Sequence, residues 1–256
     1  MSKPVVIVGA SMGGLRAAEA LRRFGYSGPI TAIGDEPYAP YNRPPLSKEV
    51  LAAEVSHEAV AFPQRPATED VNWVLATKVV SADLKHSNVT DSNGLVHDYS
   101  TLIIATGLRP KRLQCENGDL MGRHAVRTLD DAIALRAELV AGARVVILGA
   151  GFIGCEVAAT ARKLGCAVTV VAPGVHPIIR PLGLELAKEL QRRHEAEGVK
   201  FRMKTTVTDL VGEQRVEGVV LDSGETLDCD VFVEAIGSDA NVEWLEGNDL
   251  DLTDGV

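Results

Sequence analysis

The chain has 256 residues, of which 46% are hydrophobic, 24% charged and 4% aromatic, and its formal net charge is −9. This length is enough to bury a substantial core and predicts two domains. The negative charge argues against general nucleic-acid binding, although Arg109, Lys111 and Arg112 form a local basic group. No apolar stretch approaches the roughly 20 residues of a membrane helix, and no signal-peptide pattern is present, so we expect a cytoplasmic protein.

The cysteines and histidines carry no recognisable metal or redox pattern. The four cysteines form no C-x-x-C or other close pair, which favours small buried side chains in a reducing compartment. The six histidines are scattered without metal-ligand spacing, so we expect no metal site.

The first unit begins with the sequence VVIVGASMGG at residues 5–14. Its pattern predicts a strand at 5–8, a glycine-rich turn, a helix at about 15–24 and a second strand at 30–33. Residues 35–48 contain four prolines, which argue against a helix or a central strand there. Further strands are predicted at 71–75, 78–83, 89–91, 95–97 and 102–105, with a hairpin turn at 92–94.

The second unit repeats this design after a predicted linker at 108–124. Thr128 and Asp131 fit a capping box that opens a helix through about 139. A strand at 144–148, a second glycine turn, a helix to 164 and a strand at 167–171 are then predicted. A helix at about 184–197 ends at Gly198, residues 200–236 are predicted to form a β meander, and the tail 237–256 is polar.

The two glycine turns are the main chemical signal. Each follows a four-residue apolar run and precedes an alanine-rich helical stretch. A phosphate binds to free backbone N–H groups at such a helix N-terminus, where the helix dipole favours negative charge. Two such turns predict two dinucleotides, and therefore electron transfer between them.

The sequence YNRPPLSK at 41–48 resembles the Y-D-R-P-P-L-S-K signature of FAD-dependent ferredoxin reductases serving oxygenases and cytochromes P450, shared with rubredoxin reductases and apoptosis-inducing-factor relatives. Residues 105–107, 127–131 and 149–156 also match in order and spacing, so the resemblance covers essentially the whole chain. It implies an α/β fold of two Rossmann-like three-layer domains. An NAD(P)H-binding domain at 111–236 would be inserted into an FAD-binding domain formed by 1–110 and 237–256.

The resemblance assigns roles to individual residues. Gly9, Ser11 and Gly14 would bind the FAD pyrophosphate, with Ser11 at the middle glycine position, and Glu36 or its rival Asp35 would bind the ribose. The other assigned residues in contact with FAD or near the flavin are Arg43, Lys48, Thr106, Arg109 and Arg127. Cations beside a flavin would stabilise the negative charge that develops on reduction.

Lys48 and Glu156 would form the catalytic pair near the site of hydride transfer, and Gly149, Gly151 and Gly154 would hold the nicotinamide nucleotide. Alternatively, Arg43 and Lys48 are solvated surface charges, and Glu156 complements only the helix dipole. The remaining candidates for cofactor contact are Val79, Gly107, Phe152, Ile153 and Gly237.

Two departures from the family pattern stand out. Ala172 occupies the position of the acidic residue that binds the NAD ribose, while His176 and Arg180 lie close enough in sequence to meet a phosphate. The resemblance favours NADH, with NADPH as the alternative. Family members also carry an Ala-Gly-Asp motif and a C-terminal interface domain; neither occurs before Val256, so the resemblance implies a truncated chain with an incomplete FAD domain.

The function expected from this resemblance is electron transfer from NAD(P)H through FAD to a ferredoxin or rubredoxin. The absence of a close cysteine pair argues against a dithiol relay. The alternatives are an NAD(P)H oxidase or small-molecule reductase, and a fragment that acts only as a nucleotide-binding module. The oligomeric state is left open.

Overall fold

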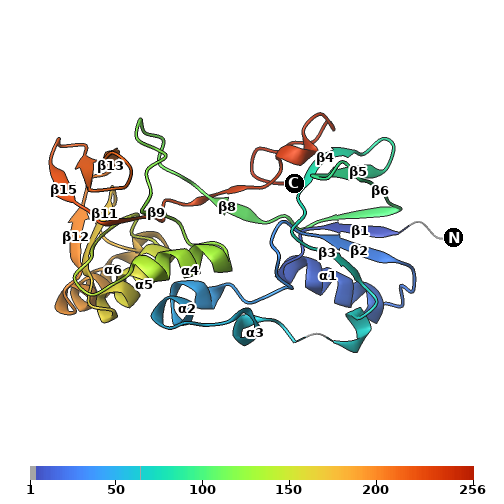
Figure 1. The fold of residues 1–256 in the computed structure, drawn as a ribbon, viewed down its shortest axis with the longest axis horizontal. Coiled ribbons are helices and arrows are strands. Elements are labelled where there is room, and N and C mark those ends of the chain that lie inside the picture. Colours follow the sequence, from blue (N-terminus) through green and yellow to red (C-terminus); the bar gives the residue numbers. More distant parts are fainter. Residues whose placement is uncertain (1–3, 64) are drawn as a thin grey trace. The chain divides into compact units, whose positions relative to one another are not determined.

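The structure is a computed structural model that describes residues 4–63 and 65–256. Its contacts divide the chain into two compact units, whose elements are labelled in Figure 1. Unit 1 contains the described residues up to Asn42 together with Ser56–Arg109 and Asp239–Val256, and unit 2 contains Arg43–Val55 and Pro110–Ser238. Within the described ranges, no helix has the length and apolar character needed to cross a membrane.

Unit 1 is built on a four-stranded parallel sheet in the order β3-β2-β1-β7. Neighbouring side chains of β1 point to opposite faces of the sheet. One face packs with α1 through Ile7 and Ala18, and the other packs with the small antiparallel sheet through Val6 and Val89. Burial on both faces explains why these strands are continuous apolar runs. The bounds are β1 Val5–Val8, α1 Met12–Arg23, β2 Ile30–Ile33, β3 Asn72–Val74 and β7 Thr101–Ile104.

The remainder of unit 1 consists of short helices and strands and the C-terminal tail. The tail, predicted to be a polar part of the FAD-binding domain, contributes Trp244 and Leu245 to the core beside β1, where they are 6% and 0% exposed. Asn248 accepts a hydrogen bond from the Leu84 N–H, which fixes the tail to the antiparallel sheet. These elements are α3 His57–Val60, η2 Pro66–Thr68, β4 Val79–Asp83, β5 Asn88–Asp91, β6 Val96–Asp98 and η3 Glu243–Leu245, and β8 Leu108–Pro110 pairs with β17 Ser238–Ala240.

Unit 2 is built on a five-stranded parallel sheet in the order β12-β11-β10-β16-β9. Its strands are β9 Arg123–His124, β10 Arg144–Leu148, β11 Ala167–Ala172, β12 Lys200–Met203 and β16 Val231–Glu234. The helices are α4 Leu129–Glu138, α5 Phe152–Lys163 and α6 Ile179–Ala196. The parallel sheets of both units confirm the predicted α/β fold class.

The meander predicted over 200–236 is wrong at both ends. Only β13 Val207–Val211, β14 Gly218–Leu221 and β15 Thr226–Asp228 are antiparallel. The strands β12 and β16 join the parallel sheet instead, and all four residues of β16 are buried. A strand buried on both faces is typical of a parallel sheet, so the continuous apolar run of β16 was a signal for this position.

The proline-rich segment also differs from its prediction. A 3₁₀ helix, η1, forms at Pro44–Ser47, and a short helix, α2, follows at Glu49–Ala52. The two prolines stand at the first positions of η1, where a missing N–H removes no helical hydrogen bond. In α6, Gly183 has a non-helical conformation with φ +74°, so the uninterrupted part of that helix begins close to the predicted start at 184.

Candidate functional site

The first glycine turn brings the N-terminus of α1 directly against the sheet of unit 1. Gly9 has φ +117°, and a Cβ on this residue would lie 2.1 Å from the Ala105 carbonyl oxygen. A Cβ on Gly14 would lie 2.0 Å from the carbonyl oxygen of Gly9. Backbone cannot move away cheaply from either contact, so both positions require glycine.

The N-terminus of α1 presents backbone donors to an anion. Ser11 is the N-cap in an extended conformation, and its side chain makes no capping hydrogen bond. The first helical bond runs from the Leu15 N–H to the Ser11 carbonyl, at 2.9 Å. The N–H groups before Leu15 therefore lack helical acceptors, and the first turn contains no acidic residue. A pyrophosphate fits this end of the helix.

Glu36 and Asp35, the two candidates for binding the FAD ribose, follow β2 and have different surroundings. The Glu36 carboxylate accepts a 2.5 Å hydrogen bond from the hydroxyl of Tyr41, which is 3% exposed, whereas Asp35 is exposed. The structure therefore orients Glu36 through the signature segment. Val79 is buried in the hydrophobic core, so its side chain packs against protein.

Thr106 and Arg109 form hydrogen bonds with the C-terminal tail. The Thr106 hydroxyl donates to the Asn241 carbonyl at 2.7 Å, and the Asn241 N–H donates to the Gly107 carbonyl at 3.0 Å. Arg109 donates to the Ala240 carbonyl at 2.9 Å. Its guanidinium also pairs with an acidic residue of η3 at 2.5 Å. These contacts give Arg109 a role in holding the tail, besides the cofactor role that the resemblance assigns to it.

The second glycine turn has the same construction in unit 2. Gly149 has φ +110°, and its Cβ would lie 2.2 Å from the Ala235 carbonyl oxygen. A Cβ on Gly154 would lie 2.1 Å from the Gly149 carbonyl oxygen, whereas open space surrounds the corresponding position on Gly151. Gly151 is the N-cap of α5 and supplies no capping side chain. A second anion site of the same type therefore fits here.

The surroundings of this turn include the other candidates in unit 2. Phe152 and Ile153, the first two residues of α5, are 55% and 45% exposed. Gly237 accepts a hydrogen bond from the Lys111 N–H at 3.0 Å and has φ +108°. The exposed pair offers apolar surface beside the phosphate site, as a nucleotide site requires.

Lys48 and Glu156 lie together in unit 2. The Lys48 Nζ is 2.8 Å from Glu156 Oε2 and 2.9 Å from the Pro44 carbonyl oxygen. The Ser47 hydroxyl donates to the same carboxylate oxygen at 2.6 Å, and the Ser47 carbonyl accepts from the Thr160 hydroxyl at 3.0 Å. The side chains of Lys48 and Glu156 are 43% and 34% exposed. Such an exposed pair contributes about 0–1 kcal/mol to stability, so stability gives little reason for its construction.

Sequence reasoning missed Ser47 and Thr160. Ser47 stands beside Lys48 in the YNRPPLSK segment, which was the available signal, whereas Thr160 lies one helical turn beyond Glu156 on α5. Arg43 and Arg127 are also joined, because the Arg43 guanidinium donates to the Arg127 carbonyl at 2.6 Å. The start of α4 beside them carries the predicted capping box, which is confirmed.

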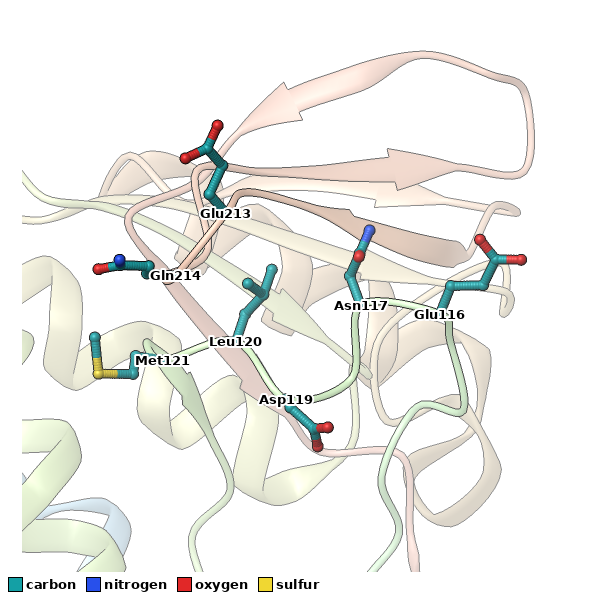
Figure 2. A pocket seen from close by; sticks show the side chains of 7 residues that line it. All are labelled: Glu116, Asn117, Asp119, Leu120, Met121, Glu213 and Gln214. Carbon is teal, nitrogen blue, oxygen red and sulfur yellow. The ribbon is translucent and has the colours of Figure 1, made fainter.

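A shallow pocket of about 500 Å³ lies elsewhere in unit 2 (Figure 2). It is lined by residues of 116–121 and 213–214, and its three carboxylate side chains, those of Glu116, Asp119 and Glu213, point in different directions. In the part of the chain that the structure describes, no group of three or more His, Cys, Asp or Glu side chains is placed to hold a metal ion.

The four cysteines are free thiols. Burial raises the pKa of Cys155, beside the second glycine turn, to about 12. Burial raises the pKa of Cys229 to about 12 as well. These buried thiols are almost entirely protonated at neutral pH and are therefore poor nucleophiles.

Comparisons with known proteins agree with this geometry. A family model described as pyridine nucleotide-disulphide oxidoreductase matches residues 3–256. The rubredoxin-NAD(+) reductase of Ectopseudomonas oleovorans is 37% identical over 98% of this chain and 66% of its own length. The ferredoxin-NAD(+) reductase component of the biphenyl dioxygenase system of Paraburkholderia xenovorans is 36% identical over 100% of this chain and 63% of its own length.

A solved structure also matches: the covalent putidaredoxin reductase-putidaredoxin complex has 31% sequence identity and a TM-score of 0.93. The match covers 99% of this chain and 63% of that chain. The chain spans less than two thirds of the length of these relatives.

Proposed function

This chain belongs to the pyridine nucleotide-disulphide oxidoreductase family, and we propose that it is a flavoprotein reductase that passes electrons from NAD(P)H through FAD to an iron–sulfur protein. The acceptor would be a ferredoxin or rubredoxin serving an oxygenase or a cytochrome P450. The observation that carries the proposal is the repeated cradle, in which a glycine turn of each unit leaves the first N–H groups of a helix open to an anion. The names of the two reductases above support the identity of the acceptor.

FAD fits unit 1, and the nicotinamide nucleotide fits unit 2. In unit 1, Gly9, Ser11 and Gly14 would hold the pyrophosphate, and Glu36 would bind the ribose in the orientation set by Tyr41. In unit 2, Gly149, Gly151 and Gly154 would hold the second pyrophosphate, with Phe152 and Ile153 providing apolar contact. When bound, FAD accepts a hydride from the nicotinamide and releases electrons one at a time to an acceptor.

Lys48 and Glu156 are proposed to position the reacting groups. Ser47 and Lys48 hold one oxygen of Glu156, and the Pro44 carbonyl restrains the Lys48 ammonium. These hydrogen bonds hold a lysine ammonium and a glutamate carboxylate at defined positions. Preorganised charges of this kind stabilise the charge that develops during a reaction. The placement of Arg43 and Lys48 against the flavin stays a prediction.

The experiment that tests the proposal couples the chain, loaded with FAD, to a one-electron iron–sulfur acceptor under anaerobic conditions. We expect NAD(P)H oxidation to depend on added ferredoxin or rubredoxin. Oxidation that needs only oxygen would instead support the oxidase alternative, and nucleotide binding without oxidation would support the binding-module alternative.

A matched pair of variants separates the site from general charge effects. Lys48→Met removes the proposed site lysine, whereas Lys188→Met removes an exposed lysine whose ion pair with Glu185, at 3.2 Å, lies on α6. We expect Lys48→Met to slow flavin reduction at least tenfold and Lys188→Met to leave it unchanged. Equal rates in both variants would refute the role of Lys48.

We propose the cytoplasm as the location. Four free thiols, three of them buried, are suited to a reducing compartment, where thiols remain reduced.

A further inference from the structure

The end of β11 lacks the carboxylate that usually binds the adenosine ribose of a nicotinamide nucleotide without a 2′-phosphate. In a fold of this type, the adenosine ribose of the second nucleotide lies just beyond this strand, where an acidic side chain binds its hydroxyl groups. Here that position is Ala172, which is 4% exposed, and Pro173, Gly174 and Val175 follow it. The ribose 2′-hydroxyl of NADH therefore meets no carboxylate from this loop.

His176, named from the sequence as a phosphate ligand, is turned toward α6. Its Nδ1 lies 2.8 Å from the Gln191 Oε1, within a chain of contacts that continues to Glu195. The amide oxygen fixes this ring nitrogen as a donor to the helix. Arg180, the second candidate from the sequence, is exposed, and its side chain makes no hydrogen bond or ion pair with the residues described.

The structure adds Lys204, which the sequence analysis did not consider. β12 runs parallel to β11 with Met203 opposite Ala172, so Lys204 is the first residue beyond the strand at the same edge of the sheet. The Lys204 N–H donates to the Gly174 carbonyl at 3.0 Å, which joins Lys204 to the loop that follows β11. Lys204 therefore lies at the edge of the loop at which the ribose would bind.

Two further features mark Lys204. It has φ +61°, a left-handed conformation that is uncommon for a residue with a side chain and is held here by its neighbours. Its ammonium group is exposed and, across 4–63 and 65–256, has no hydrogen bond or ion pair. A cation that serves no internal contact is available to a ligand.

The nearby carboxylates are already engaged. Asp222 accepts a hydrogen bond from the Thr205 hydroxyl, and Glu225 pairs with Arg202 at 2.6 Å. Both carboxylates that contact the residues flanking Lys204 are thus occupied, and the Lys204 ammonium is left for a ligand. This arrangement favours a phosphate over a hydroxyl at the ribose 2′ position, because a cation binds a phosphate and a ribose hydroxyl requires an acceptor.

We propose that the nucleotide site of unit 2 prefers the 2′-phosphorylated nucleotide, NADP(H), and that Lys204, assisted by Arg180, binds the 2′-phosphate. This inference rests on the proposed function, because it assumes that unit 2 holds a nicotinamide nucleotide. It reverses the preference for NADH that the family resemblance favours.

The test uses two probes that lack nicotinamide, ADP-ribose and 2′-phospho-ADP-ribose, and measures their affinities for the purified chain by titration calorimetry. No redox chemistry is involved, and the chain is saturated with FAD beforehand, so that the ADP part of the probes does not occupy the cradle of unit 1. We expect the 2′-phosphorylated probe to bind at least tenfold more tightly, as a charge-assisted contact requires, with a preference that declines as salt increases.

Three variants assign the preference to a residue. Lys204→Met keeps an unbranched side chain of similar length at the left-handed position, and we expect it to abolish most of the preference without changing the affinity for ADP-ribose. Lys204→Arg should retain the preference. Lys200→Met, at the opposite end of the same strand, should change neither affinity.

Equal affinities of the unmodified chain for the two probes would overturn the inference while leaving the proposed function intact. A preference that survives Lys204→Met would overturn the role of Lys204. Failure of both probes to bind would contradict the proposed function and the inference together. Unfolding of each variant, followed by circular dichroism, verifies that the loss of affinity occurs in a folded chain.

Discussion

Two adjacent glycines in the first turn are expected to respond to alanine in opposite directions. A Cβ on Gly13 would meet only the Ala105 Cβ at 3.5 Å, an ordinary contact, whereas a Cβ on Gly14 would lie 2.0 Å from the Gly9 carbonyl oxygen. Real Cβ atoms essentially never approach closer than 3.0 Å, so Gly14→Ala must separate α1 from the turn by about an ångström.

The two effects have different magnitudes. Gly13→Ala restricts the unfolded chain and improves helix propensity, which stabilises by about 0.4–1 kcal/mol. Gly14→Ala forces an overpacked contact against backbone, which costs about 1–3 kcal/mol or more. The two variants should therefore differ by about 1.5–4 kcal/mol in the free energy of unfolding, a gap of several degrees in Tm for a chain of this size.

Tryptophan fluorescence during urea unfolding measures the difference in unfolding free energy between the two variants, and it reports on unit 1, which contains both glycines. Both tryptophans of the chain, Trp73 in β3 and Trp244 in η3, belong to unit 1. We expect the urea midpoint to rise or stay constant for Gly13→Ala and to fall clearly for Gly14→Ala. Equal midpoints for the two variants would refute the tight strand-to-helix contact on which the first cradle depends.

Three other predictions concern buried groups. Glu234→Gln leaves Arg123, 6% exposed, without its carboxylate partner and should cost about 3–5 kcal/mol in urea unfolding, whereas the double variant Arg123→Met with Glu234→Leu should cost less than the two single changes together. The hydrogen bond from His97 lowers the pKa of Asp91, so the stability it contributes is present above pH ~4 and is lost as pH falls through the lowered pKa. Asp91→Asn should therefore reduce the acid dependence of unfolding, and an unchanged pH profile would argue against this contribution. Cys155 should not react with a thiol reagent at pH 8 until the chain unfolds, because its pKa of about 12 leaves roughly one thiolate in 10⁴; rapid labelling of this thiol in the folded chain would contradict the burial.

The parts of the fold that depend on short-range patterns were predictable. The strands at 5–8, 30–33 and 144–148 coincide with the observed β1, β2 and β10, because apolar runs bounded by glycine specify buried parallel strands. The capping box of α4 at Thr128 and Asp131 was equally predictable, since both partners lie within one helical turn.

The features that were missed depend on contacts between distant residues. The apolar run of β16 indicates a strand buried on both faces, but the local pattern does not show that its neighbour is β10, because that choice depends on contacts distant in sequence. The contact of Ser47 with Glu156 joins residues 109 positions apart. The ion pair of Arg123 with Glu234 spans 111 positions, and it buries a charge that the sequence alone would place at the surface.

Lys204 was missed for the same physical reason. In the sequence, a lysine that follows a partly exposed strand is expected to be a solvated charge. Only the parallel pairing of β12 with β11 places Lys204 beside the end of β11, where the ribose is proposed to bind. His176 had the better position in sequence, yet its contact with Gln191 turns it toward the helix.

The proposed reductase must hold FAD and transfer electrons to it from NAD(P)H. The most direct measurement is the visible absorption spectrum of the purified chain, incubated with FAD and freed of excess, before and after anaerobic addition of NADH or NADPH. We expect a bound yellow flavin whose absorbance is bleached by the nucleotide. A chain that stays colourless after incubation with FAD, or a bound flavin that neither nucleotide bleaches, would contradict the proposed function.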